Sequence, residues 1–92
     1  MNSININEIK KYTNYKIIDI RPKEDYMKGH IPGAINVELT DLLAFPEKYL
    51  NKNITYFFYC DEGKTSMKLV NVLKNKYDVF NLNGGYKEYN KL

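Results

Sequence analysis

The stretch ITYFFYCDEGKTS, residues 54–66, decides the fold of this chain. Its first six residues are all β-branched or aromatic, which is typical of a strand buried on both faces of a sheet. Cys60, the only cysteine, follows this strand, and a short polar loop with one glycine then leads into a helical pattern. Ligands bind at the carboxyl ends of strands in open α/β sheets, and the amino end of a helix favours anions. The stretch therefore predicts a place for a thiolate where the strand ends.

The length and the composition of the chain indicate one globular domain, which we assign to residues 1–92. A chain of this length can bury roughly 60–68% of its unfolded surface without disulfides or metals. Its hydrophobic content of 43% and charged content of 27% are ordinary for a soluble protein. No run approaches the ~18 apolar residues of a membrane span, and the first residues lack the apolar core of a signal peptide. We therefore expect a cytoplasmic protein that does not bind a membrane.

The cysteine count and the charge exclude several classes of site. A single cysteine cannot form an intramolecular disulfide, and no second cysteine is present for a zinc site. The net charge of +3 comes from scattered lysines, of which only Lys10 and Lys11 are adjacent. A nucleic-acid footprint would cluster its basic residues on one element. We therefore expect no structural metal, no nucleic-acid partner, and a monomer.

The rest of the chain alternates short strands with helices. Besides the cysteine strand, the patterns predict strands at residues 15–20, 34–37 and 79–82. They predict helices at residues 4–12 (after one or two strand residues), 23–28, 38–43 and from 65 onward. A turn is predicted at residues 48–50 and a last turn or helix at 84–89. In the helix from Thr65 we expect Val72 on the buried stripe and Lys68 in water. The alternation is typical of a compact α/β domain with a mostly parallel sheet of about five short strands and helices on both faces.

Asp19 and Arg21 are candidate supporting residues, because they lie near the carboxyl end of the strand predicted at residues 15–20, on the same sheet edge as Cys60. They could orient the loop or a substrate. We favour the alternative of a structural ion pair with Glu24 or Asp25.

Other residues near the predicted turns are interpreted as structural. His30, the only histidine, lies in a proline turn, where a hydrogen-bonded structural role is expected rather than that of a base. Gly84 and Gly85 are expected to serve a turn that needs positive φ or close backbone approach.

Three segments together resemble the rhodanese family. Residues 17–37, IIDIRPKEDYMKGHIPGAINV, are similar to its amino-terminal signature; residues 59–66, YCDEGKTS, to its active-site loop; and residues 82–89, LNGGYKEY, to its closing Gly-Gly motif. The order and spacing of these motifs extend the resemblance over nearly the whole chain. It implies a sulfurtransferase in which Cys60 becomes a persulfide and passes its outer sulfur to a thiol or a cyanide-type nucleophile.

The resemblance also implies how the sulfur is held and what it meets. The family's loop surrounds the sulfur with inward-pointing backbone N–H groups, here those of Asp61, Glu62, Gly63, Lys64, Thr65 and Ser66. It implies no metal or organic cofactor, and its partners would be a small-molecule or protein sulfur donor and a thiol acceptor. Many members carry arginine five places after the cysteine, whereas this chain has Thr65 there and Lys64 one place earlier.

The charge of the loop bears on the choice of donor. A free cysteine with a pKa of about 8.5 is only about 3% thiolate at pH 7, so a nucleophilic Cys60 needs loop N–H groups and Lys64 to lower its pKa. Asp61 and Glu62 oppose this, and with the thiolate counted residues 60–66 carry a formal charge of −2. A dianion such as thiosulfate would be repelled. We therefore expect a protein or low-molecular-weight persulfide as the donor, with thiosulfate a poor substitute.

Three other interpretations of Cys60 and its loop compete with sulfur transfer. Most free cysteines are small buried hydrophobes, but a strand end before a glycine loop favours a reactive role for Cys60. A cysteine phosphatase needs an arginine six places after its nucleophile, where this chain has Ser66, so phosphatase activity is not expected. A rhodanese-like fold without catalysis, acting as a protein-binding or regulatory module, remains the second function class.

Overall fold

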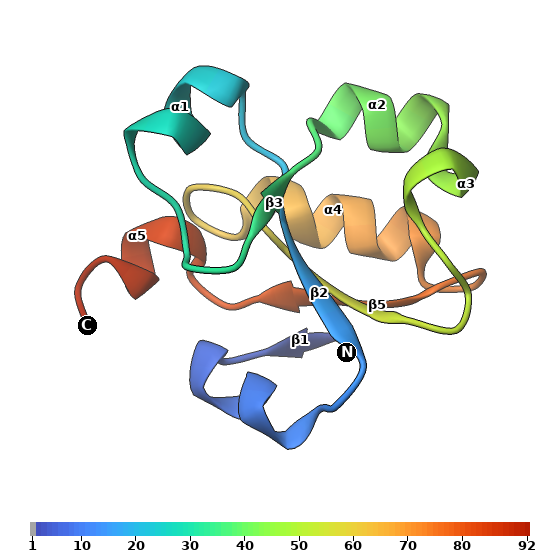
Figure 1. The fold of residues 1–92 in the computed structure, drawn as a ribbon, viewed down its shortest axis with the longest axis horizontal. Coiled ribbons are helices and arrows are strands. Elements are labelled where there is room, and N and C mark those ends of the chain that lie inside the picture. Colours follow the sequence, from blue (N-terminus) through green and yellow to red (C-terminus); the bar gives the residue numbers. More distant parts are fainter. Residues whose placement is uncertain (1) are drawn as a thin grey trace.

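A five-stranded parallel sheet forms the centre of the computed structural model, which describes residues 2–92 (Figure 1). The strands are β1 (Ser3–Ile4), β2 (Tyr15–Asp19), β3 (Ile35–Asn36), β4 (Thr55–Tyr59) and β5 (Asp78–Leu82), in the spatial order β1-β5-β4-β2-β3. Every neighbouring pair is parallel. β4 occupies the middle of the sheet, and its last four residues are buried, as its continuous apolar run predicts. The predicted fold class is confirmed.

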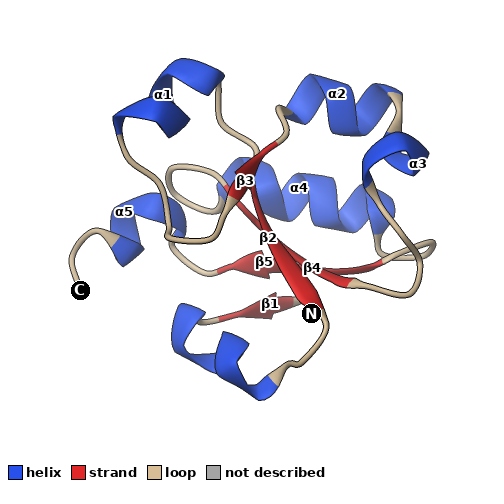
Figure 2. Cartoon of the chain, in the orientation of Figure 1, coloured by secondary structure: helices blue, strands red, loops and turns tan. Residues whose placement is uncertain are grey.

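Helices cover both faces of this sheet (Figure 2). α2 (Leu39–Ala44), α3 (Pro46–Tyr49) and α4 (Lys64–Leu73) lie on one face, and the 3-10 helix η1 (Ile6–Lys11) and α5 (Gly85–Tyr89) on the other. α1 (Lys23–Lys28) follows β2 and has no buried residue. Within residues 2–92, no helix combines the length and the apolar character needed to cross a membrane.

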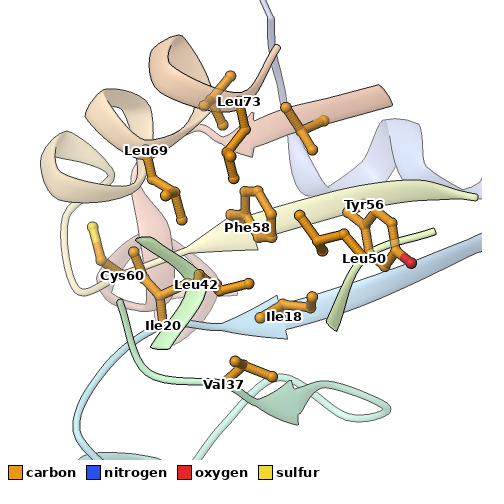
Figure 3. Packing of buried hydrophobic residues seen from close by; sticks show 12 residues of the cluster. Ile18, Ile20, Val37, Leu42, Leu50, Tyr56, Phe58, Cys60, Leu69 and Leu73 are labelled. Atoms are coloured by element: carbon orange, nitrogen blue, oxygen red, sulfur yellow. The ribbon is translucent and has the colours of Figure 1, made fainter. Parts of the chain in front are cut away.

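The core has two layers, one on each face of β4. Successive side chains of a strand point to opposite faces, so Tyr56 and Phe58 pack toward α2 and α4, whereas Phe57 and Tyr59 pack toward η1 and α5. All four are at most 2% exposed. Figure 3 shows the first of these layers, with Cys60 at one end of the cluster. The packing of both layers therefore fixes β4, and with it the position of Cys60 at the carboxyl end of this strand.

Most predicted elements are present, with shifts of one or two residues at their ends. α1 has the predicted bounds, while α4 begins at Lys64 rather than at Thr65. The prediction for Val72 is wrong: its side chain is 64% exposed. Leu69, Val70 and Leu73 form the buried stripe of α4, and a residue two places from Val70 points away from that stripe in a helix of 3.6 residues per turn. Lys68 is exposed, as expected.

Candidate active site

The loop between β4 and α4 is short and sharply turned. Cys60 follows the last residue of β4, and Gly63 caps α4 with a φ of +90°. A side chain would be strained at that φ, and a Cβ on Gly63 would lie 3.2 Å from the backbone nitrogen of Gly84. The glycine turn therefore lets the start of α4 fold back over the cysteine.

The sulfur of Cys60 accepts hydrogen bonds from the loop and from the start of α4. The backbone N–H groups of Gly63 and Ser66 donate to Sγ at 3.1 and 3.4 Å, and the Ser66 hydroxyl lies 3.3 Å from it. Burial by itself raises the pKa of the Cys60 thiol. Hydrogen bonds that the ionised sulfur accepts from the Ser66 side chain and from the backbone N–H groups of Ser66 and Gly63 outweigh burial and lower that pKa below its ordinary value. Two of the six predicted loop N–H groups thus bond to the sulfur directly.

A cavity of about 480 Å³ opens beside the sulfur, within the usual size range of ligand sites. Cys60 lines it together with four of the predicted loop residues, Asp61, Glu62, Lys64 and Thr65. Gly63 and Ser66 are not part of the cavity wall; they are buried and bonded to the sulfur. The rest of the lining comprises three apolar residues, Ile20, Pro22 and Leu39, and three polar ones, Arg21, Glu38 and Thr40. The predicted loop is therefore brought together around a space that can hold a small organic molecule.

Asp19 and Arg21 pair with each other at the end of β2. Arg21 Nη2 lies 2.7 Å from Asp19 Oδ2, and Arg21 Nε donates to both carboxylate oxygens. Neither Glu24 nor Asp25 forms an ion pair with Arg21 in the described part of the chain, so the predicted pairing with α1 is wrong. The Arg21 backbone N–H also donates to Asp19 Oδ1, so the carboxylate bridges both the backbone and the side chain of the same residue.

The Arg21 guanidinium connects this pair to the cysteine loop. It donates to the carbonyl oxygen of Gly29 at 2.6 Å, lies 3.4 Å from Asp61 Oδ1 and stacks 4.4 Å from the ring centre of Tyr86. Burial would lower the pKa of Arg21, but its hydrogen bonds and charge interaction with Asp19 raise that pKa above the ordinary value. Four of its five N–H donors bond to the protein, which favours orientation of the loop over substrate binding.

The second acid of the loop also has a partner that sequence reasoning missed. Lys87 Nζ lies 3.4 Å from Glu62 Oε2, although both side chains are more than half exposed. Asp61 and Glu62 thus each face a cation, Arg21 and Lys87. Adding these two cations, together with the Asp19 carboxylate that pairs with Arg21, changes the formal charge of −2 on residues 60–66 to −1. The repulsion expected for a dianionic donor is therefore weaker than the loop sequence alone suggests.

The start of α5 fixes the backbone of the cysteine loop. The N–H groups of Tyr86 and Lys87 donate to the carbonyl oxygens of Cys60 and Asp61, each at 2.9 Å. Gly85 has a φ of +62°, and a Cβ there would overlap the carbonyl oxygen of Cys60. The expectation of positive φ or close backbone approach is confirmed, since both Gly84 and Gly85 have positive φ. With their carbonyl groups held by α5, these peptides keep a fixed orientation around the sulfur.

His30 lies outside this site. Its Nδ1 is 2.9 Å from the carbonyl oxygen of Tyr26, and its ring stacks on that of Tyr26 with centres 3.8 Å apart. The expected hydrogen bond of His30 is present, and its structural role stays a prediction. Among residues 2–92, no group of three or more His, Cys, Asp or Glu side chains is placed to hold a metal ion.

Asn81 is a further residue of the site that sequence reasoning missed. Its side chain is 4% exposed and accepts a hydrogen bond from the Ser66 hydroxyl at Oδ1. The signal for it was an asparagine two places after Val79, on the α4 face of a buried strand where an apolar residue would be expected.

Similarity to known proteins agrees with this geometry. The family model of the rhodanese-like domain matches residues 4–92. A tRNA sulfurtransferase of Pyrobaculum aerophilum is 40% identical over 58 residues, which are 63% of this chain but only 12% of that protein. The putative sulfurtransferase YtwF of Bacillus subtilis is 33% identical over 72 residues, 75% of this chain and 67% of that protein. The crystal structure of SSP1007 from Staphylococcus saprophyticus, 30% identical, has a TM-score of 0.83 and covers 97% of this chain and 93% of its own. This chain belongs to the family of rhodanese-like domains.

Proposed function

We propose that this domain is a sulfurtransferase that carries sulfur as a persulfide on Cys60. The observation that carries the proposal is the sulfur itself, which faces a cavity while accepting backbone hydrogen bonds that lower the pKa of its thiol. The sulfurtransferase names of two relatives and the family membership support the same reaction class. Only an ionised cysteine is a competent nucleophile near neutral pH, so the lowered pKa is the property that the reaction needs.

The proposed reaction has two displacement steps and consumes no oxidant or reductant. The Cys60 thiolate attacks the outer sulfur of a donor R–S–S⁻; a new S–S bond forms, the donor's S–S bond breaks, and R–S⁻ leaves with the electron pair. An acceptor thiolate then attacks the outer sulfur of the Cys60 persulfide, and Cys60 leaves as a thiolate. A low thiol pKa favours this second step, because the better leaving group is the more acidic thiol.

The backbone of the loop can bind both sulfurs of the persulfide. Gly63 and Ser66 donate to the inner sulfur. The first hydrogen bond inside α4 runs from the Met67 N–H to the carbonyl of Gly63, so the N–H groups of Lys64 and Thr65 have no partner within the helix. Both residues line the cavity. We assign their N–H groups to the outer sulfur, whose negative charge the amino end of a helix favours.

We propose an organic persulfide, on a protein or a small thiol, as the donor. Acidic side chains outnumber basic ones in the cavity wall, where Glu38, Asp61 and Glu62 face Arg21 and Lys64. Of these two cations, the Arg21 guanidinium is already bonded to Asp19. Within the described residues, Lys64 is therefore the cation of the cavity wall that has no ion pair. The apolar lining residues Ile20, Pro22 and Leu39 suit the carbon chain of a thiol carrier, which thiosulfate lacks.

Mass spectrometry of the intact protein tests the reaction. Treatment with a low-molecular-weight persulfide should add about 32 Da, the mass of one sulfur atom, and cyanide should remove it as thiocyanate. Cys60→Ser, which keeps a hydrogen-bonding atom at the same place, should show no adduct. Failure of every donor to give the adduct would contradict catalysis and favour the protein-binding module.

Steady-state assays with cyanide as the acceptor test the choice of donor. The persulfide should give a clearly higher kcat/KM than thiosulfate, because thiosulfate brings two negative charges to a cavity with one available cation. Saturation by thiosulfate at low micromolar concentration would overturn this preference without affecting the proposed persulfide on Cys60.

A further inference from the structure

The buried amide of Asn81 contacts the cysteine loop from the neighbouring strand. Asn81 lies on the face of β5 that packs on α4, two places after the core residue Val79. Burial of an amide costs free energy unless the amide is hydrogen-bonded. Its Oδ1 accepts the hydroxyl proton of Ser66, which is completely buried and lies 3.3 Å from the sulfur of Cys60. The three side chains therefore form a row, Cys60–Ser66–Asn81.

The bond from Ser66 to Asn81 determines which atom can donate in the contact between Ser66 and the sulfur. A serine hydroxyl has one proton, and that of Ser66 points to Asn81 Oδ1. The contact between Cys60 Sγ and Ser66 Oγ then needs the S–H group as its donor. All donors point from Cys60 toward Asn81, which is the arrangement of a neutral thiol.

An ionised sulfur requires the opposite arrangement. A thiolate or persulfide anion has no proton to donate, so Ser66 must turn its hydroxyl toward the sulfur to stabilise the charge. Asn81 Oδ1 would then lose its donor, and an unsatisfied buried acceptor is costly. Half a turn of the amide presents Nδ2–H to Ser66 Oγ instead and restores the bond. Gly63 leaves room beside the amide, since a Cβ there would lie 3.6 Å from Asn81 Nδ2.

We propose that Asn81 is a positioning residue for Cys60: its amide turns the Ser66 hydroxyl from acceptor for the thiol to donor for the sulfur anion. The inference rests on the proposed function, in which that anion is the reacting group. Charged groups also surround the site. Arg21 at the end of β2, Glu38 before α2, Asp61 and Glu62 in the loop and Lys64 in α4 line the cavity with Cys60, while Asp19 and Lys87 pair with Arg21 and Glu62. In residues 2–92 none of them is hydrogen-bonded to the side chain of Ser66 or Asn81, so their effect is separable from that of the row.

Alkylation of Cys60 by iodoacetamide as a function of pH tests the role of Asn81 without any sulfur donor. Asn81→Asp should raise the pKa of Cys60 and slow alkylation at pH 7 about tenfold or more, because an ionised carboxylate only accepts and retains the Ser66 proton. Asn81→Leu releases that proton, so the pKa of Cys60 should be equal to or below that of the wild type. Asn83→Asp, which adds the same charge at an exposed position just after β5, is the matched control and should change the rate less than about twofold.

The same substitutions in a Ser66→Ala background separate the effect that acts through the Ser66 hydroxyl from simple charge repulsion between the new carboxylate and the Cys60 thiolate. Without the hydroxyl, the effect of Asn81→Asp should fall at least threefold, to the part due to charge alone. An unchanged alkylation profile in Asn81→Asp, or an equal effect without Ser66, would overturn the inference. Should Asn81→Asp fail to fold, a raised Cys60 pKa in Asn81→Leu overturns it equally. Because alkylation needs only the thiol, these outcomes are independent of whether the protein transfers sulfur.

Discussion

The loops that follow β2 and β4 leave neighbouring strands at the same edge of the sheet, where Asp19 and Tyr59 are paired in register. After β2, the carboxylate of Asp19 and the guanidinium of Arg21 bond each other, and two further Arg21 N–H groups donate to Gly29 and Asp61. After β4, backbone N–H groups converge on a sulfur that still faces a cavity. The fold uses most of the donors of the first loop, and the second keeps capacity for a ligand. A sheet edge thus becomes a site only where some of its donors are left over.

The largest expected effect comes from removing the carboxylate that Arg21 binds in the loop after β2. Asp19→Ala leaves the buried Arg21 without its carboxylate and should lower the free energy of unfolding by about 3–5 kcal/mol, measured by urea denaturation. Glu62→Ala, which breaks the exposed pair with Lys87, is the control and should cost less than about 1 kcal/mol. Asp19→Leu combined with Arg21→Met should recover much of the loss. Equal costs for Asp19→Ala and Glu62→Ala would show that the buried pair does not hold the loop.

The next effect separates backbone strain from crowding against the cysteine loop. Gly33 and Gly85 both have positive φ, but a Cβ on Gly33 meets nothing within 4 Å, whereas one on Gly85 overlaps the Cys60 carbonyl. Gly85→Ala should therefore destabilise the protein by about 1–3 kcal/mol more than Gly33→Ala and should also slow alkylation of Cys60. If the two variants had the same stability and the same alkylation rate, α5 would not be fixing the loop.

A smaller effect is expected from adding a cation to the open loop. Thr65→Arg places a guanidinium in the cavity wall and should raise kcat/KM for thiosulfate about tenfold, equivalent to about 1.4 kcal/mol. Asn71→Arg adds the same charge to α4 away from this cavity and should have little effect. A similar gain from both variants would mean that overall charge, and not the cavity, governs the use of this donor.

The smallest effect concerns the pH dependence of stability. The folded protein lowers the pKa of Cys60, so between the folded and unfolded pKa values the unfolded chain binds more protons and stability rises with pH. The thiolate contribution should be lost as pH falls through the folded pKa and be complete above the unfolded value, about 8.5 for a free cysteine. The difference in unfolding free energy between wild type and Cys60→Ser should therefore shift in favour of the wild type as pH rises. A difference that is flat or shifts the other way would contradict the lowered pKa.

The sequence predicted the features that depend on local patterns. The run TYFFY identifies a strand buried on both faces, a glycine three places after Cys60 identifies a tight turn, and Gly84–Gly85 identify a turn with positive φ or close backbone approach. Each depends on residues adjacent in the chain. For the same reason the location of the cysteine at the sheet edge followed from its place between a strand and a helix.

The features that the sequence did not predict depend on how distant elements dock. Lys87 meets Glu62 only because α5 packs beside the cysteine loop, and Asn81 meets Ser66 only because α4 lies over β5. The partner of Arg21 was misjudged for another reason: its side chain folds back onto Asp19, two places earlier, instead of forward onto α1. Side-chain direction at the end of a strand is set by the packing around it, here by Tyr86 and Gly29.

The hydrogen bonds from Tyr86 and Lys87 to the carbonyls of Cys60 and Asp61 have a consequence for synthesis of the protein. The ribosome makes the cysteine, its glycine turn and α4 before the segment that fixes their peptide groups. A nascent chain that ends before Gly84 lacks both of these hydrogen bonds, although Cys60 and the start of α4 have already been made. The two carbonyl groups are held only once α5 docks. The final orientation of the peptides around Cys60 therefore depends on a segment that is synthesised after them.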